Sequence, residues 1–332
     1  MKMILNQFMK LFIVPIIFIF ISFLFIKCES SEKLKPDFSS VPLDIQIDRF
    51  DKEFFNSEDD EIVDLKNKYP FFFPKEFDDS IWLKRKNDPL LSLLNSEINK
   101  VFFSDKVLKT PIEKVFKHIK YYFPNYKIPK VITVSNNVDY LNKVILNDSL
   151  LIISIDTYLG NKNKIYSGIP NYLVEQMDIK YLSSNILDEF LMKIIPKSNE
   201  RSFISKIINH GKKLFLKDLL IPNLKDEIKI GYTQSQFKWA KENELFIWRF
   251  FVQNEFLFST NPSLEDRFIN PSPFSKFYLE IDNLSPGKIG QWIGWKIVRS
   301  FMEKNKEISI SDLINISESD IYINSNYKPF KQ

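Results

Sequence analysis

The residues that could hold a metal ion or act as a nucleophile are few in this sequence. The chain of 332 residues contains two histidines, His118 and His210, and one cysteine, Cys28. Two histidines exclude a three-histidine metal site within one chain, and one cysteine excludes both an intrachain disulfide and a thiolate metal cluster. The zinc signature HExxH needs two histidines four positions apart on one helix face, so it cannot occur here. We therefore expect no metal ion and no other cofactor.

The glycines do not form a phosphate-binding loop. The first of the seven is Gly160, so the first 159 residues contain no glycine-rich loop of either common kind. No G-x-S-x-G elbow for a nucleophilic serine occurs either. Gly287, Gly290 and Gly294 lack the dinucleotide spacing and lie instead along one face of a helix. We expect them to allow close packing. Gly294→Ala should then destabilise the fold only mildly, whereas Gly294→Leu should destabilise it by overpacking.

The overall charge gives no sign of a nucleic-acid partner. Lys and Arg number 46 and Asp and Glu number 42, so the formal net charge is +4. Over this length, that charge does not indicate nucleic-acid binding, and the sequence identifies no small-molecule substrate. The hydrophobic fraction of 44% is ordinary and supplies enough apolar side chains for a sizeable core.

The N-terminus has the features of a secretory signal. Residues 11–26 are apolar and uncharged behind a basic start, and they fall somewhat short of the roughly 20 residues of a membrane-spanning helix. Cys28 follows almost at once, which is the arrangement of bacterial lipoproteins. We therefore predict a signal peptide at 1–27, a lipidated, polar tether at 28–40 and a single domain at 41–332. Several acyl chains on one N-terminus would anchor the chain stably.

A second interpretation of the N-terminus stays open. Small residues are usual directly before a lipidated cysteine, whereas this chain has Phe25, Ile26 and Lys27. The alternative is an uncleaved signal anchor with an incidental Cys28.

Strand patterns occur early in the domain. Leu43, Ile45 and Ile47 alternate with polar residues, and β-branched apolar runs at 131–134 and 150–155 predict two further strands, with a hairpin turn at Asn147. Helices are expected at about 89–103 and from the capping-box pattern at Thr110, with Pro111 at its first position, to the residue before Pro124.

Helical patterns dominate after residue 170. We expect helices at 184–195 and 202–220, a long helix to about Phe258 that begins with a capping box at Thr233 and Gln236, and a last helix from near Gly287 to about Lys304. The last helix should bury its tryptophans against the preceding long helix, around Phe246, Trp248 and Phe250. Strands early and helices late predict an α+β fold, mainly α, with a small N-terminal sheet packed with a helical bundle.

Several long motifs resemble one known family. They are LLIISIDTYLG at 150–160, IGYTQSQFKWAKENELFIWRFF at 230–251 and RFINPSPFSKFYLEIDNLSPGKIGQWIGWKIVRSFMEKN at 267–305, together with FKHIKYYFPNYKIPKV at 116–131 and IDRFD at 47–51. The chain resembles the gliding-motility lipoprotein family GldB over nearly the whole of its predicted mature length. The predicted signal and cysteine match that family too.

That family is in turn similar to predicted zinc peptidases of the zincin type, which end in a similar P-G-x-I-G-x-W-I-G helix. The resemblance puts Asp188 and Met192 in the places of the two HExxH histidines, Glu189 in the place of the general base, and His210 in the place of the glutamate ligand. Asp, Met and His cannot reproduce a two-histidine, one-glutamate zinc site. Without zinc no water is activated, so the resemblance implies a zincin-like scaffold without catalytic residues.

The resemblance also implies a location and partners. It implies a non-catalytic pseudo-peptidase in the cell envelope. A lipid anchor would hold this protein on the outer membrane, on the side that faces the periplasm. Its partners would be other proteins of the gliding machinery and of the associated protein secretion machinery. The alternative is an envelope hydrolase or peptidase that uses an unrecognised site or a metal site shared between subunits.

Overall fold

The computed structural model describes residues 37–329. The predicted signal peptide, residues 1–27, and the predicted lipidation site, Cys28, lie outside the described residues, as does most of the predicted tether. A compact unit of the chain begins at Val41. Within residues 37–329, none of the helices has both the length and the apolar character that crossing a bilayer requires.

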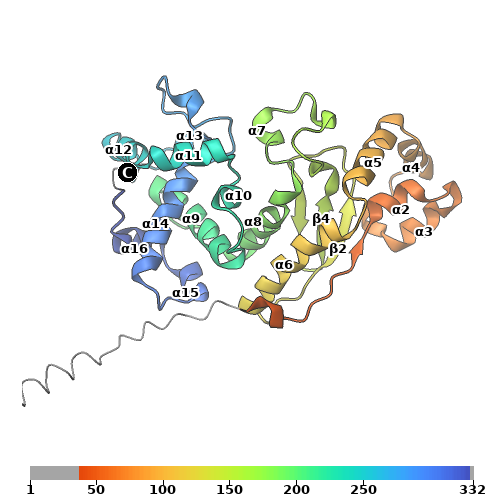
Figure 1. The fold of residues 1–332 in the computed structure, drawn as a ribbon, viewed down its shortest axis with the longest axis horizontal. Helices are drawn as coiled ribbons and strands as arrows, with labels where there is room; N and C mark the ends of the chain where they lie inside the picture. Colours follow the sequence, from red (N-terminus) through yellow and green to blue (C-terminus); the bar gives the residue numbers. More distant parts are fainter. Residues whose placement is uncertain (1–36, 330–332) are drawn as a thin grey trace, which may run out of the picture. The chain divides into compact units, whose positions relative to one another are not determined.

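A four-stranded mixed sheet lies in the first half of the chain (Figure 1). The strand order is β1-β2-β4-β3, with parallel pairing of β1 to β2 and of β2 to β4, and antiparallel pairing of β3 to β4. The predicted strands at 131–134 and 150–155 and the hairpin are confirmed. The Asn147 side chain closes the hairpin turn by accepting two backbone N–H bonds. The strands are β1 (Ile47–Asp48), β2 (Lys130–Val134), β3 (Val144–Leu146) and β4 (Leu150–Ser154).

The alternating segment 43–47 forms less strand than its pattern predicted. Only Ile47 and Asp48 pair with β2. The backbone amide of Ile45 donates instead to the carboxylate of Glu113 at 3.3 Å. Alternation of apolar and polar residues indicates that one side of a segment is buried. It does not indicate which groups accept the hydrogen bonds of the backbone.

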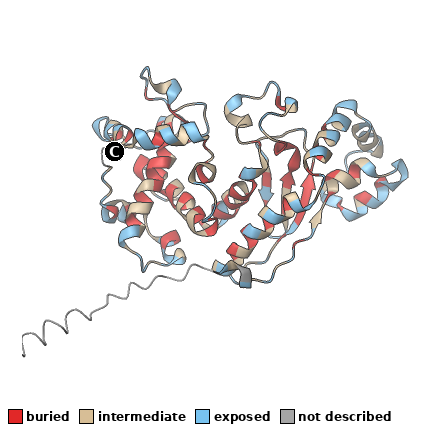
Figure 2. Ribbon diagram, in the orientation of Figure 1, coloured by how far each residue is buried: buried red, intermediate tan, exposed pale blue. Residues whose placement is uncertain are grey.

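Apolar residues lie on both faces of the sheet, and Figure 2 shows buried positions along the strands. Ile132 packs on one face against a small aromatic cluster that includes Phe54, whereas Leu151 and Ile153 belong to the larger core on the other face. The helices of this half are α2 (Phe50–Asn56), α3 (Ile62–Lys68), α4 (Asp79–Lys86), α5 (Pro89–Val101) and α6 (Lys106–Tyr122).

Helix α6 begins earlier than its capping-box pattern predicted. It starts at Lys106 and contains Pro111 in its interior. The amide of Lys109 donates to the carbonyl of Asp105 at 2.8 Å, so a helical turn already precedes the proline. A proline near a helix start removes one backbone hydrogen bond, and the buried apolar face of α6 stabilises the helix in spite of it.

The second half of the described chain is helical, as predicted. Its helices are α7 (Asn171–Val174), α8 (Leu182–Ile194), α9 (Phe203–Leu220), α10 (Asp226–Ile230), α11 (Gln234–Glu242), α12 (Glu244–Gln253), α13 (Ser263–Phe268), α14 (Ile289–Lys304), α15 (Ile310–Asn315) and α16 (Glu318–Ser325). Short 3₁₀ helices lie at Phe38–Ser40, Asp59–Glu61, Pro70–Phe72, Ile155–Thr157, Lys164–Tyr166, Ile179–Tyr181 and Asp282–Leu284. The expected α+β fold, mainly α, with a small N-terminal sheet, is confirmed.

One long helix of the prediction is two helices in the structure. The capping box of Thr233 and Gln236 forms at the start of α11 as expected, but the helix does not continue to Phe258. Asn243 caps the C-terminal end of α11, where its backbone leaves the helical conformation (φ −105°, ψ 10°) and its side-chain amide donates to the carbonyl of Trp239 at 2.9 Å. The apolar pattern runs through this break without a gap, so periodicity alone did not show it.

The closest contact between helices joins α9 and α14. A Cβ atom added at Gly294 would lie 1.7 Å from the carbonyl oxygen of Ile207, and one added at Gly211 would lie 2.2 Å from the carbonyl oxygen of Gly294. The predicted burial of Trp292 and Trp295 is confirmed. Their helix, however, packs most closely against α9, whereas the sequence predicted the segment around Phe246, Trp248 and Phe250.

The Gly294→Ala variant should be clearly destabilised, contrary to the mild effect that the sequence predicted. The added methyl group overlaps a backbone carbonyl rather than a movable side chain, so the helices must separate. We expect a loss of about 1–3 kcal/mol or more in the free energy of unfolding. Glu303→Ala on the exposed side of the same helix is the matched control, with an effect within about 0.5 kcal/mol. Denaturant unfolding of the full-length protein in detergent measures both, and equal stability of the two variants would contradict the contact.

Candidate functional site

Helix α8 carries two of the predicted residues into a cleft. Asp188 and Glu189 line a cleft of about 380 Å³ together with residues of the β2–β3 loop, of α7 and of the segment before α14. Met192, one turn further along, is 52% exposed and does not line the cleft. The structure therefore brings Asp188 and Glu189 together and leaves Met192 on the surface.

Helix α9 adds His210 to the same place. His210 and Asp188 both line a recess of about 70 Å³ that shares Asp188 and Lys288 with the larger cleft. Three of the four predicted positions thus lie around two adjoining cavities that share lining residues. His118, the other histidine, is buried elsewhere, where its Nδ1 contacts the carbonyl of Leu220.

Asp188 is held by a buried lysine. The Nζ atom of Lys217 lies 2.7 Å from Oδ1 of Asp188, and the Lys217 side chain is 2% exposed. The same ammonium group donates to the hydroxyl of Ser184 at 2.8 Å and to the carbonyl of Lys229 at 3.0 Å. All three of its N–H donors are used, so Lys217 fixes the position of Asp188.

Besides Lys217 and Lys229, three lysines line this cavity, and the sequence analysis did not identify them. Lys143 precedes β3, Lys213 lies on α9 between His210 and Lys217, and Lys288 immediately precedes α14. The spacing of Lys213 and Lys217, four residues apart on one helix face, is a signal in the sequence. In the sequence alone, this spacing is typical of an exposed, charged helix face. The fold shows instead that α8, α10 and α14 surround this face.

Burial and like charges shift the pKa values of these groups. Burial, and the nearby charge of Lys288, lower the pKa of Lys143 to about 8. Burial likewise lowers the pKa of Lys288 to about 8. Burial next to Lys213 and Lys288 lowers the pKa of His210 to about 4, so that imidazole is neutral at pH 7. Burial and the charge of Asp188 raise the pKa of Glu189.

A zinc ion does not fit this arrangement. The only carboxylate at a ligand position, Asp188, is already paired with Lys217, and Met192 is exposed and lines neither the cleft nor the recess. Ammonium groups that line the same recess repel a divalent cation. In the described part of the chain, no group of three or more His, Cys, Asp or Glu side chains is arranged to hold a metal ion.

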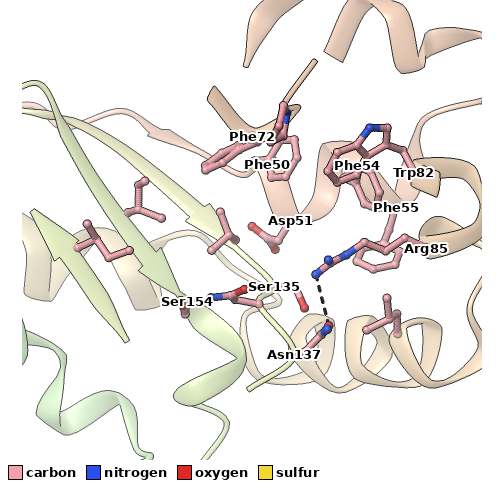
Figure 3. Close-up of a pocket in the computed structure, with 16 residues that line it drawn as sticks. Phe50, Asp51, Phe54, Phe55, Phe72, Trp82, Arg85, Ser135, Asn137 and Ser154 are labelled. Atoms are coloured by element: carbon pink, nitrogen blue, oxygen red, sulfur yellow. Dashed lines mark hydrogen bonds between the residues drawn. The ribbon is translucent and has the colours of Figure 1, made fainter. Parts of the chain in front are cut away.

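A second cavity lies over the sheet, on the side of α2 (Figure 3). It measures about 350 Å³ and has an aromatic wall that includes Phe50, Phe55 and Trp82. Its buried carboxylate is Asp51, which already accepts two bonds from Arg49, at 3.0 and 2.7 Å, and one from the hydroxyl of Thr133. This carboxylate is satisfied within the protein, and none of the predicted site residues lines this cavity, so the cavity with α8 and α9 is the better candidate for a functional site.

The fold and the cavity define a mainly helical α+β protein with a lysine-lined cleft that does not fit zinc. The family model of gliding motility protein GldB matches residues 31–329. Because that match covers most of the sequence, the chain belongs to the GldB family of gliding-motility lipoproteins. No curated protein and no solved structure matches the chain.

Replacing His210 should reduce the acid sensitivity of the fold. The pKa of His210 is about 4 in the folded protein and about 6.5 when unfolded. The unfolded chain therefore binds the proton more readily, and the folded state loses stability as the pH falls from 6.5 to 4, by up to about 3 kcal/mol. In His210→Gln this part of the pH dependence should disappear. Urea unfolding at several pH values measures it, and parallel curves for the two proteins would contradict a neutral, buried His210.

Proposed function

We propose that this protein serves gliding motility and the associated secretion machinery by binding a protein partner, without catalysis. One observation carries the proposal: the cavity between α8 and α9 holds Asp188 in an ion pair with Lys217 at 2.7 Å, where a metallopeptidase needs a free ligand. A site that attracts anions and does not fit a metal is suited to recognition. The proposed binding site is the part of the cleft around Lys143 and Lys288.

The degenerate zincin scaffold is part of this proposal. Its support is that Asp188 and Glu189, on one helix, and His210, on the next helix, lie around two adjoining cavities. This is the arrangement that the resemblance to zinc peptidases implied. The surface position of Met192 and the lysines around the cavity support the loss of the metal.

The proposed location is the cell envelope. We infer that the signal peptide, residues 1–27, is removed and that Cys28 carries acyl chains. These chains would hold the protein on the outer membrane, on the side that faces the periplasm. Residues 28–40 would act as a polar tether, and residues 41–332 as a single domain. The support is the apolar run at 11–26 that ends just before the only cysteine.

A hydrolase remains the second candidate, because Glu189 has some features of an acid–base catalyst. Burial raises its pKa, and it shares the cleft with Lys143 and Lys288, whose pKa values are lowered to about 8. A cleft that contains both a carboxyl group with a raised pKa and lysines with lowered pKa values is typical of catalytic sites.

Cys28→Ala should abolish lipidation. We expect cells grown with a clickable fatty acid to label the wild-type protein and not this variant. The matched control is Ser39→Ala, which removes a hydroxyl near the end of the predicted tether and should label normally. Equal label in Cys28→Ala and wild type would favour the uncleaved signal anchor.

Glu189→Gln should leave gliding intact. A non-catalytic protein needs no general base, so a strain that carries only this variant should glide at the wild-type rate. The purified wild-type protein should contain well under one zinc per chain by elemental analysis. Loss of gliding in a stable Glu189→Gln variant, or one zinc per chain that is lost in His210→Ala, would favour the hydrolase.

A further inference from the structure

The cavity between α8, α9 and α14 contains positive charge that the protein does not balance. Two buried lysines of the recess, Lys217 and Lys229, have carboxylates at 2.7 and 2.8 Å, from Asp188 and Asp218. The other three lysines that line the cavity differ from them. Among the described residues, no ion pair is formed by Lys143, Lys213 or Lys288.

The carboxylates of the cavity compensate these lysines only in part. Asp188 forms its ion pair with Lys217, although its charge also raises the pKa of Lys213 and Lys288 against the effect of burial. Glu189 forms no ion pair with a described residue, and burial next to Asp188 raises its pKa, which favours its neutral form. Burial also lowers the pKa of Lys213, so all three unpaired ammonium groups are held in surroundings that disfavour their charge. Lys143 donates to the carbonyl of Gln176 at 3.4 Å and Lys288 to that of Ile230 at 2.9 Å, but neither has a carboxylate in an ion pair. Partly buried charges without a counter-charge cost free energy, and a bound anion would recover part of it.

The position of Lys288 is fixed by the backbone around it. Its φ angle is 60°, in the left-handed region that few residues other than glycine adopt. The preceding Gly287 is held by the Tyr232 hydroxyl, which donates to its carbonyl at 2.7 Å. The Lys288 ammonium donates to the carbonyl of Ile230 at 2.9 Å. Strained backbone of this kind persists at binding sites, where it fixes a group before the ligand arrives.

We propose that the cavity binds the carboxylate of an acidic side chain of a protein partner beside Lys288, with Lys143 on the side of the cleft and Lys213 on the side of the recess. This inference deepens the proposed function and rests on the cleft being the partner-binding site.

The walls of the cleft favour a peptide as the source of that carboxylate. Tyr140, Leu141, Tyr172 and Leu173 line the cleft and offer apolar surface to neighbouring side chains. Leu141 is 80% exposed, and Tyr172 is half-buried. Among the described residues no arginine lines either the cleft or the recess, and arginine is the residue whose paired donors match phosphate best.

The test compares four probes on the full-length protein in detergent, by calorimetric titration. They are the tripeptide acetyl-Ala-Glu-Ala-amide, the same peptide with Gln in place of Glu, free glutarate and inorganic phosphate. We expect the Glu peptide to bind and the Gln peptide not to bind. Glutarate should bind more weakly than the Glu peptide, because it lacks the flanking residues. Equal binding of the two peptides, no binding of any probe, or a preference for phosphate would each overturn the proposal.

Two variants separate binding from folding. Lys213→Met and Lys288→Met remove one unpaired charge each, and each should weaken binding of the Glu peptide by about tenfold or more. Both should also raise the melting temperature of the ligand-free protein, whereas a lysine that serves only the fold would lower it. Lys193→Met is the control, because Lys193 lies on α8 but pairs with Asp148 outside the cleft. Unchanged peptide affinity in both cleft variants would overturn the proposal.

A gliding assay distinguishes the proposed function of the cleft from the inference that the cavity binds a carboxylate. If the Glu peptide binds as expected but Lys213→Met cells glide normally, then the carboxylate site exists and the cleft is not where the gliding partner binds. If Lys213→Met cells stop gliding while the Glu and Gln peptides bind equally, then the cleft serves gliding and the carboxylate inference is wrong.

Discussion

The contact of backbone against backbone between α9 and α14 is the constraint on which the candidate site depends. At Gly294 and Gly211 the two helices approach until no methyl group fits between them. Gly211 directly follows His210, and Lys288 directly precedes α14. The distance between the helices therefore sets how close the imidazole and the ammonium group can lie. Glycine destabilises an isolated helix. Glycines nevertheless occupy these two positions, because no larger residue allows the helices to approach this closely.

Around that contact the protein pairs its buried charges. Asp218 of α9 accepts hydrogen bonds from the indole of Trp295 at 3.0 Å and from the guanidinium of Arg299 at 2.8 Å, both on α14. Lys212, also on α9, pairs with Glu318 of α16 at 2.8 Å. Removing one partner from such a pair leaves an uncompensated buried charge, which is strongly destabilising. These pairs fix the two helices laterally, and the glycines fix their separation.

The sequence predicted the elements of this fold better than their contacts. The strands at 131–134 and 150–155, the helices of the second half and the capping box at Thr233 were evident, because local propensity and packing agree there. The start of α6 and the break at Asn243 were not, since the apolar pattern continues through both. The packing of α14 against α9 was also missed, because glycine spacing shows that something approaches closely but not which helix it is.

The site was only half visible in the sequence. The family motifs led to Asp188, Glu189 and His210, which the structure brings to two adjoining cavities, but also to Met192, which lies on the surface. The lysines were missed because an exposed and an enclosed lysine look alike in one sequence. They also limit what substitution could do. Histidines at positions 188 and 192 would not create a zinc site, because Lys213, Lys217 and Lys288 would repel the ion and position 192 lies on the surface. A metal-binding variant would need these lysines replaced as well, so changes at the ligand positions alone cannot turn the cleft into a metal site.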